Sequence, residues 1–218
     1  TLRNGGFMNH KQEALALAAR GIHKNLEKLG MEGYYFEDCA SMVKAILSMM
    51  PEGSVLSWGG SASLSESGMM DAIQKGKYTL IDRSTAQSDQ ERREVYAKTV
   101  MSDFYFCSTN ALTLEGELVN IDGNGNRVAC LIHGPQHVML LVGMNKVVKD
   151  LDCAVKRIRT QACPANAIRL NMNTPCAVTG TCADCLSPGC FCNQIVVTRR
   201  SRHAGRIKVF LVGQELGF

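Results

Sequence analysis

The chain has 218 residues, of which 45% are hydrophobic and 20% are charged, and its formal net charge at pH 7 is +4. This length and apolar content suffice to bury one substantial core, which excludes a disordered chain and a small scaffold that depends on disulfides. No apolar run approaches the roughly 18 residues of a membrane span, and the first residues lack the apolar segment of a secretory signal. We therefore expect a cytoplasmic protein.

Basic residues gather in the last third of the chain, where residues 146–218 hold 11 Lys and Arg against 4 Asp and Glu. Nucleic-acid surfaces usually add aromatic or groove-reading elements to such a cluster, and the sequence shows none here. A small anionic ligand or an acidic partner is the better interpretation. A solvated basic face is the alternative that requires no function.

The first half of the chain alternates helical and strand patterns at short intervals. Residues 1–7 have the character of a leader, and we place one domain at residues 8–218. From there the periodicity predicts helices over residues 10–29 and after the candidate N-cap Asp38, and then strands at 54–58, 78–82 and 104–108 that alternate with helices at 65–74 and 89–100. This alternation is typical of βαβ units, so we expect an α/β fold with a mainly parallel sheet flanked by helices.

The pattern changes after Thr109, where short strands and glycine-rich turns follow one another. The sequence predicts strands at 118–121, 128–132 and 138–142, a hairpin or tight turn at 122–125, helices at 150–161 and 164–170, and strands at 194–198 and 207–212. We therefore expect an antiparallel portion added to the parallel sheet. A cysteine-rich loop, residues 174–193, is inserted near the C-terminus of the same domain.

The most distinctive pattern is a run of five cysteines within seventeen residues: Cys176, Cys182, Cys185, Cys190 and Cys192. The prolines and glycines between them are too turn-rich for a helix and interrupt a strand. Thiolates that converge on one ion would hold such a segment, and in a cytosolic protein a cysteine cluster indicates metal more often than disulfides. Zinc and an iron–sulfur cluster both use four such ligands, so either one fits. Disulfides and unliganded thiols are the alternatives.

The other five cysteines are interpreted differently. Cys163 begins a C-P-x-x-A-I string that resembles the end of a bacterial ferredoxin motif, but the companion cysteines do not precede it, so we interpret the likeness as accidental. The remaining four lie within apolar elements and are predicted to be buried as small hydrophobic residues: Cys39, Cys107, Cys130 and Cys153.

Two polar segments predict a ligand site. In residues 55–68 a strand, a glycine turn and a helix place Gly60, Ser61 and Ser63 near a helix N-terminus, which favours anions. This segment fits neither the P-loop nor the dinucleotide-binding pattern, and the chain carries no nicotinamide or flavin motif. In residues 108–129 a second polar group surrounds the short strands and could line the same pocket.

Two carboxylates are candidate catalytic groups. Glu66 lies in the first turn of the predicted helix, and Glu115 lies beside a glycine between two predicted strands. A capping role explains Glu66, and a role in the turn explains Glu115, as well as a catalytic role does. From residue chemistry alone no reaction can be named.

Taken together, these segments resemble the LUD domain family of lactate-utilisation proteins, in its small single-domain form. The resemblance rests on these strings: GGSASLSESG, STNALTLEGELVNIDGNGNRVA, VGMNKVVKDLDCAVKRIR, PANAIRLN, TPCAVTGTCADC, CNQIVVTRRS and RIKVFLVGQELG. It implies the fold of sugar-phosphate isomerases and CoA-transferases. It also implies an accessory or catalytic subunit linked to oxidation of lactate or a related 2-hydroxy acid, beside iron–sulfur redox subunits.

The resemblance also implies which residues form the sites. The small anionic ligand would lie at the following residues: Gly60, Ser61, Ser63, Asn110, Asn126, Arg127 and Lys146. One iron–sulfur cluster or zinc ion would be held by Cys176, Cys182, Cys185 and Cys192, with Cys190, at a position that is often arginine, as the alternative ligand. Two other functions stay open: a stand-alone CoA-ester or sugar-phosphate enzyme that uses Glu66 or Glu115, and a binding or regulatory module stapled by zinc.

Overall fold

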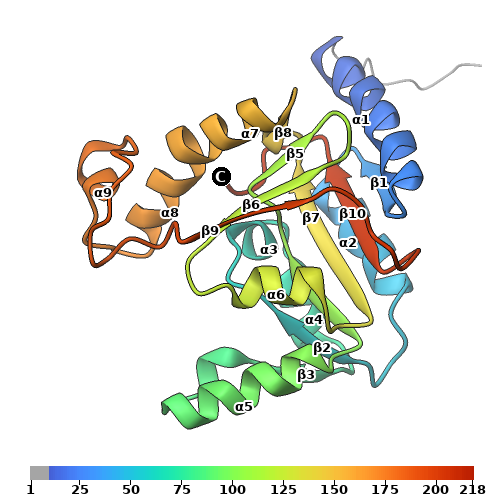
Figure 1. Ribbon diagram of the computed structural model, residues 1–218. Helices are drawn as coiled ribbons and strands as arrows, with labels where there is room; N and C mark the ends of the chain where they lie inside the picture. The colour runs from blue at the N-terminus through green and yellow to red at the C-terminus, as the bar shows by residue number, and fades with distance from the viewer. Residues whose placement is uncertain (1–9) are drawn as a thin grey trace, which may run out of the picture.

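The computed structural model describes residues 10–218, so the predicted leader and the predicted start of the domain at residue 8 lie outside the described residues. A parallel sheet of six strands forms the centre of the fold (Figure 1). Its strands, in spatial order, are β1 (Glu32–Phe36), β10 (Ile207–Val212), β7 (His137–Gly143), β4 (Phe104–Cys107), β2 (Val55–Trp58) and β3 (Thr79–Ile81). Every neighbouring pair in this order is parallel, as the strand–helix alternation predicted.

Helices cover both faces of this sheet, because alternate residues of its strands point to opposite sides. On one face α1 (His10–Lys28) packs with Tyr105 and Cys107 of β4. On the other face Phe104 and Phe106 of the same strand pack with residues of three further helices: α2 (Cys39–Ser48), α3 (Ala62–Glu66) and α4 (Met69–Lys75). The α5 helix (Asp89–Val100) begins at a capping box of Ser88 and Glu91.

A second sheet provides the predicted antiparallel portion. Its order is β8 (Val147–Val148), β5 (Ala111–Thr113), β6 (Leu118–Asp122) and β9 (Gln194–Thr198). The β5–β6 and β6–β9 pairs are antiparallel, whereas β5–β8 is parallel. A helical stretch packs on this sheet through a small apolar cluster, and it consists of α7 (Leu151–Arg157), a π-helical turn (Ile158–Ala162) and α8 (Cys163–Arg169).

The structure corrects the predicted strand at 128–132, and at 122–125 it has the tight turn rather than the hairpin. Residues Asn126–Ile132 form the helix α6, which follows β6 after a tight turn. The Asp122 carboxylate accepts a hydrogen bond of 2.8 Å from the Gly125 amide, and Gly125 takes a φ of 78°. This side-chain bond turns the chain into a helix instead of a second strand. The short apolar run at 128–132 fits the periodicity of a helix as well as that of a strand, so the turn residues before it determine which of the two forms.

Three smaller predictions also change. The predicted helix at 65–74 is two helices, α3 and α4, separated at Gly68, whose φ is 77°. The cysteine-rich segment contains one short helix, α9 (Pro175–Thr179), which ends at Gly180 with a φ of 73°. Cys39 and Cys153 are half-buried, whereas Cys107 and Cys130 are buried as predicted.

The lengths and compositions of the helices also bear on whether the chain can cross a membrane. Over residues 10–218 none of them has the length and apolar character needed to span a membrane.

Candidate functional site

A cavity of about 480 Å³ opens where the carboxyl ends of the parallel strands meet the second sheet. Ligands in open α/β sheets bind at this edge, because the loops that follow the strands converge there. One side, which we call the sheet floor, consists of residues 60–63, 108–110, 121–127 and 146. The opposite side, which we call the cysteine wall, consists of residues 162–193 and contains α8 and α9 (Figure 1).

All seven residues predicted to bind the ligand line this one cavity. They come from four separate segments of the sheet floor: Gly60, Ser61, Ser63, Asn110, Asn126, Arg127 and Lys146. Residues nearly ninety positions apart in the sequence are therefore brought together. Whether they contact a ligand stays a prediction.

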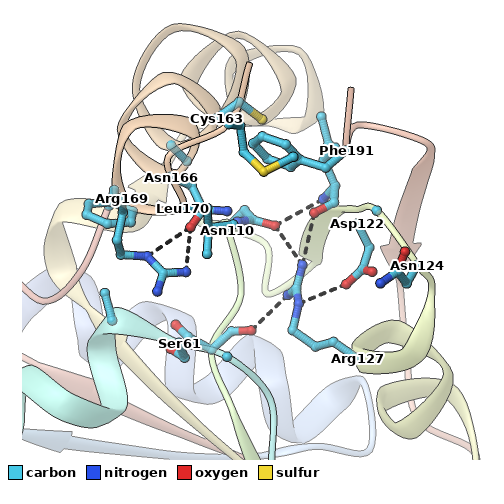
Figure 2. Close-up of a pocket in the computed structure, with 18 of the residues that line it drawn as sticks. Ser61, Asn110, Asp122, Asn124, Arg127, Cys163, Asn166, Arg169, Leu170 and Phe191 are labelled. Atoms are coloured by element: carbon cyan, nitrogen blue, oxygen red, sulfur yellow. Dashed lines mark hydrogen bonds and ion pairs between the residues drawn. The ribbon is translucent and has the colours of Figure 1, made fainter. Parts of the chain in front are cut away.

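Arg127 holds the sheet floor together. Its Nε donates to the Asp122 carboxylate at 3.0 Å (Figure 2). Its Nη1 donates to the Ser108 carbonyl at 3.1 Å and to the Asn120 amide oxygen. Its Nη2 donates to the Asn110 amide oxygen and to the Ile121 carbonyl, both at 3.0 Å. A guanidinium has five N–H donors, and all five are used here. Arg127 therefore positions neighbouring groups and has no free N–H for a ligand.

Asn110 is positioned by this network. Its side-chain oxygen accepts from Arg127 and from the Ile121 amide at 3.0 Å, which fixes the direction of the side chain. Its Nδ2 makes no hydrogen bond with any residue that the structure describes. Because Asn110 lines the cavity, this amide group is a free donor that a ligand oxygen can use.

Lys146 lies at the bottom of the sheet floor and is 3% exposed. Its Nζ lies 2.8 Å from the Ser63 Oγ and 3.1 Å from the Ser108 Oγ. The pKa of Lys146 is lowered from 10.5 to about 7. Burial is the main cause, the charges of Arg157 and Arg127 act in the same direction, and Glu66 acts in the opposite direction.

Two cations that sequence reasoning missed also line the cavity. Arg83 follows β3 in a 3-10 turn, and a Cβ added to Gly60 would clash with its Nη2. Arg169 ends α8 on the cysteine wall, where its Nε and Nη2 donate to Asn166 at 3.1 and 2.7 Å (Figure 2). The absence of a side chain at Gly60, which lets Arg83 lie over the turn, was the one signal in the sequence.

The two candidate catalytic carboxylates lie outside the lining of the cavity. Glu66 is exposed, and its Oε2 accepts a hydrogen bond of 2.5 Å from the Gly217 amide. Glu115 is exposed on the turn between β5 and β6, next to Gly116, which approaches Leu26 of α1. Glu66 acts on the cavity through its charge near Lys146, and Glu115 lies remote from it.

Six cysteines gather in the cysteine wall, and one of them was not expected there. The Cys192 thiol donates to the Cys163 sulfur at 3.4 Å, which lowers the pKa of Cys163 and raises that of Cys192. The Cys185 sulfur lies 3.5 Å from the Ser187 hydroxyl. Cys176 is buried in α9, where its sulfur lies 3.3 Å from the Thr174 hydroxyl. Cys163 therefore lies beside Cys192 of the cysteine cluster, a contact that its incomplete motif does not predict.

These thiols suit a metal by their chemical type, but their positions in this structure do not surround a common point. Several thiols in one turn-rich segment are the donor set that zinc and iron–sulfur clusters use. However, no three Cys, His, Asp or Glu side chains among residues 10–218 are arranged around a common point that could hold an ion. Among the described thiols only Cys163 and Cys192 are hydrogen-bonded to each other, so a metal would require the segment to close around it.

Comparisons with known proteins agree with this architecture. A family model described as the LUD domain matches residues 19–212. The chain is similar to the crystal structure of a DUF162 family protein from Deinococcus radiodurans, at 13% identity and a TM-score of 0.54, over 91% of this chain and 98% of that chain. It also matches the crystal structure of eIF2B delta from Chaetomium thermophilum, at 14% identity and a TM-score of 0.36, over 54% of this chain and 50% of that chain. The first likeness shows the fold, and the second is too weak to carry an inference. A search of curated proteins found no match.

Proposed function

The chain belongs to the LUD domain family, which is associated with lactate utilisation, and from this premise we propose that its cavity binds a small carboxylate of the 2-hydroxy or 2-oxo acid class. One observation carries the proposal, and it is the charge of the cavity. Of the described residues that line it, four are basic and one is acidic: Arg83, Arg127, Lys146, Arg169 and Asp122. The acid is paired with Arg127 within the sheet floor, so the remaining cations attract an anion.

The donors that face the cavity have separate roles. Arg169 and Arg83 lie on opposite sides and can form charge-assisted hydrogen bonds with a carboxylate. The free amide group of Asn110 and the hydroxyl of Ser61 suit the remaining oxygens of a small hydroxy acid or oxo acid. Arg127 serves this site by holding Asn110 in place.

We propose that the protein acts as an accessory or catalytic subunit in the oxidation of lactate or a related 2-hydroxy acid, beside partner subunits that carry iron–sulfur redox groups. The association of the family with lactate utilisation supports this role. The basic segment after β9, with Arg199, Arg200 and Arg202, is a suitable face for an acidic partner.

The ligand class is tested by calorimetry on the full chain with L-lactate, pyruvate, inorganic phosphate and acetyl-CoA. We expect the two carboxylates to bind and Arg169→Gln to weaken their binding about tenfold, because one charge-assisted bond is lost. Arg93→Ala, an exposed arginine of α5 remote from the lining, is the matched control and should change nothing. If phosphate or acetyl-CoA binds and the carboxylates do not, the ester-enzyme alternative replaces the proposal.

A second candidate function is a metal centre in the cysteine wall. The gathering of six cysteines favours it, with Cys176, Cys182, Cys185 and Cys192 as the expected ligands and Cys190 or Cys163 as additional donors. Such a centre would supply an electron carrier if it is an iron–sulfur cluster, or a structural staple if it is zinc.

The metal is tested by anaerobic purification, a visible absorption spectrum, and analysis of iron, zinc and sulfide on the same sample. Iron with sulfide and a visible absorption band identifies an electron carrier, and zinc without colour identifies a staple. Cys192→Ser should lower the metal content, whereas Cys39→Ser, in α2 on the far face of the sheet, should leave it unchanged. A protein purified without any metal contradicts this candidate.

A further inference from the structure

Lys146 is a buried cation without a paired acid. Its side chain reaches the cavity from the 3-10 turn Met144–Lys146 after β7, and its two hydrogen-bond partners are neutral hydroxyl groups. Within residues 10–218 no carboxylate lies within hydrogen-bonding distance of its Nζ. The acid whose charge acts on it, Glu66, is bonded to the Gly217 amide instead. A buried ammonium group without a counter-ion is costly, so a functional reason for this lysine is expected.

The two serines form a polar pair around the amine. The Ser108 hydroxyl donates to the Leu141 carbonyl at 2.6 Å, and the Ser63 hydroxyl donates to the Leu216 carbonyl at 3.3 Å. Their lone pairs are therefore directed at the Nζ when the amine carries its proton. When the amine is neutral, the longer bond of Ser63 leaves that hydroxyl able to turn and exchange a proton with the nitrogen.

The position of Lys146 favours a reactive amine. Burial and the neighbouring guanidinium groups of Arg157 and Arg127 disfavour its charge, so a large fraction of the side chain is neutral near pH 7. A desolvated lysine beside other cations is the arrangement that makes the amine a nucleophile toward carbonyl carbons. The same cavity offers Arg169 and Arg83 for a carboxylate, so a carbonyl next to a carboxylate would be held near the nitrogen.

We propose that Lys146 condenses with the C2 carbonyl of a 2-oxo acid bound in the cavity and forms an imine. The inference rests on the proposed function, because it takes the carboxylate site as given. The Nζ lone pair attacks C2, and the electrons of the C=O double bond move to the oxygen, which takes up a proton. The resulting carbinolamine then loses this oxygen as water while the nitrogen loses its protons. The Ser63 and Ser108 hydroxyls are placed to carry these protons. One carbonyl and one amine become one imine and one water, and no oxidant or reductant is consumed.

The test is reductive trapping on the full chain. The protein is incubated with pyruvate and sodium cyanoborohydride, digested, and mapped by mass spectrometry. We expect one carboxyethyl adduct, on Lys146, and protection of this residue by oxamate, which resembles pyruvate but does not form an imine. Lys146→Arg should abolish the adduct, and Lys149→Arg, an exposed lysine three residues along the chain, should leave it intact. L-lactate, which has no carbonyl group, should give no adduct.

Each outcome decides the inference. Adducts spread over exposed lysines and unaffected by oxamate would overturn it, as would pyruvate that binds in calorimetry but leaves Lys146 unmodified. In the second case the proposed carboxylate site stands and the imine alone fails. If pyruvate neither binds nor reacts, both fail together. The peptide map of the wild-type protein gives the answer even if the Lys146→Arg variant does not fold.

Discussion

The sheet floor and the cysteine wall differ in how their polar groups are bonded. In the sheet floor every donor of Arg127 has a partner, and Lys146 is held by two serines. In the cysteine wall Cys163 and Cys192 contact each other, and Arg169 is bonded to Asn166 of its own helix. The sheet floor thus has a fixed geometry for positioning a substrate, whereas the cysteine wall keeps groups that can still bind something else. The two sides of the cavity therefore differ in how many of their polar groups are already fixed by hydrogen bonds within the protein.

Of the substitutions that test this difference, one at the centre of the sheet floor should have the largest effect on stability. Arg127→Met removes five hydrogen bonds and leaves Asp122, which is 8% exposed, without its ion pair. We expect the free energy of unfolding to fall by about 3–5 kcal/mol, because a buried charge loses its partner. Denaturant unfolding measures it, with Arg93→Ala as the control. An effect below about 1 kcal/mol, typical of a surface pair, would contradict the fixed geometry of the sheet floor.

Metal removal should affect the cysteine wall and leave the sheet floor intact. If the thiols hold zinc, a chelator should lower the melting temperature and increase proteolysis within residues 174–193, because metal binding is coupled to folding of the segment. Limited proteolysis with mass spectrometry locates the cuts. Cleavage that begins instead at the strands of the parallel sheet would show that the cysteine wall is not an independent unit.

Lys146→Met should stabilise the protein in acid. At pH 6, below its lowered pKa of about 7, Lys146 is charged in both the folded and the unfolded chain, so the full cost of burying the charge is present. Between pH 7 and 10.5 the unfolded chain binds more protons than the folded one, so wild-type stability from this group rises with pH.

We therefore expect Lys146→Met to raise the free energy of unfolding by about 1–3 kcal/mol at pH 6, with the gain vanishing near pH 10. Both serines keep their carbonyl acceptors after the substitution, so no hydroxyl is left unbonded. Urea unfolding at the two pH values measures the difference, and Lys149→Met gives the baseline. A loss of stability at pH 6 would show that the amine, although buried, is stabilising.

The smallest effect should come from the glycine turn of the sheet floor. A Cβ at Gly60 would meet the Arg83 guanidinium, which is the flexible end of an exposed side chain and can move. Gly60→Ala should therefore change stability by about 0.5 kcal/mol or less and weaken carboxylate binding several-fold, because Arg83 is displaced. Calorimetry with L-lactate measures it. Unchanged binding would remove Arg83 from the site.

The sequence predicted the parallel sheet, and the seven residues that the family resemblance implied as ligand-binding lie together in the sheet floor, for a physical reason. The buried strands β4 and β10 carry continuous apolar runs, and the polar residues that follow parallel strands must converge at one edge. The helix α6 was missed because the Asp122 side chain, and not the apolar period, determines how the chain turns.

The cysteine wall was harder to predict from local patterns. Cys163 was dismissed because its motif is incomplete in sequence, yet the fold places it beside Cys192, twenty-nine positions along the chain. Arg83 lies in none of the strings that carry the resemblance, and Arg169 lies in PANAIRLN without an expected role, since only tertiary structure brings them to the cavity. The saturation of Arg127 likewise depends on acceptors from two separate segments, residues 108–110 and 120–122.

The most direct test of the carboxylate site is a crystal structure of the full chain with oxamate. We expect its carboxylate to contact Arg169 or Arg83, with the Asn110 amide group donating to the ligand and the amide end of oxamate near the Lys146 Nζ. Oxamate bound elsewhere on the protein, or a cavity that holds only water at a saturating concentration, would contradict the account.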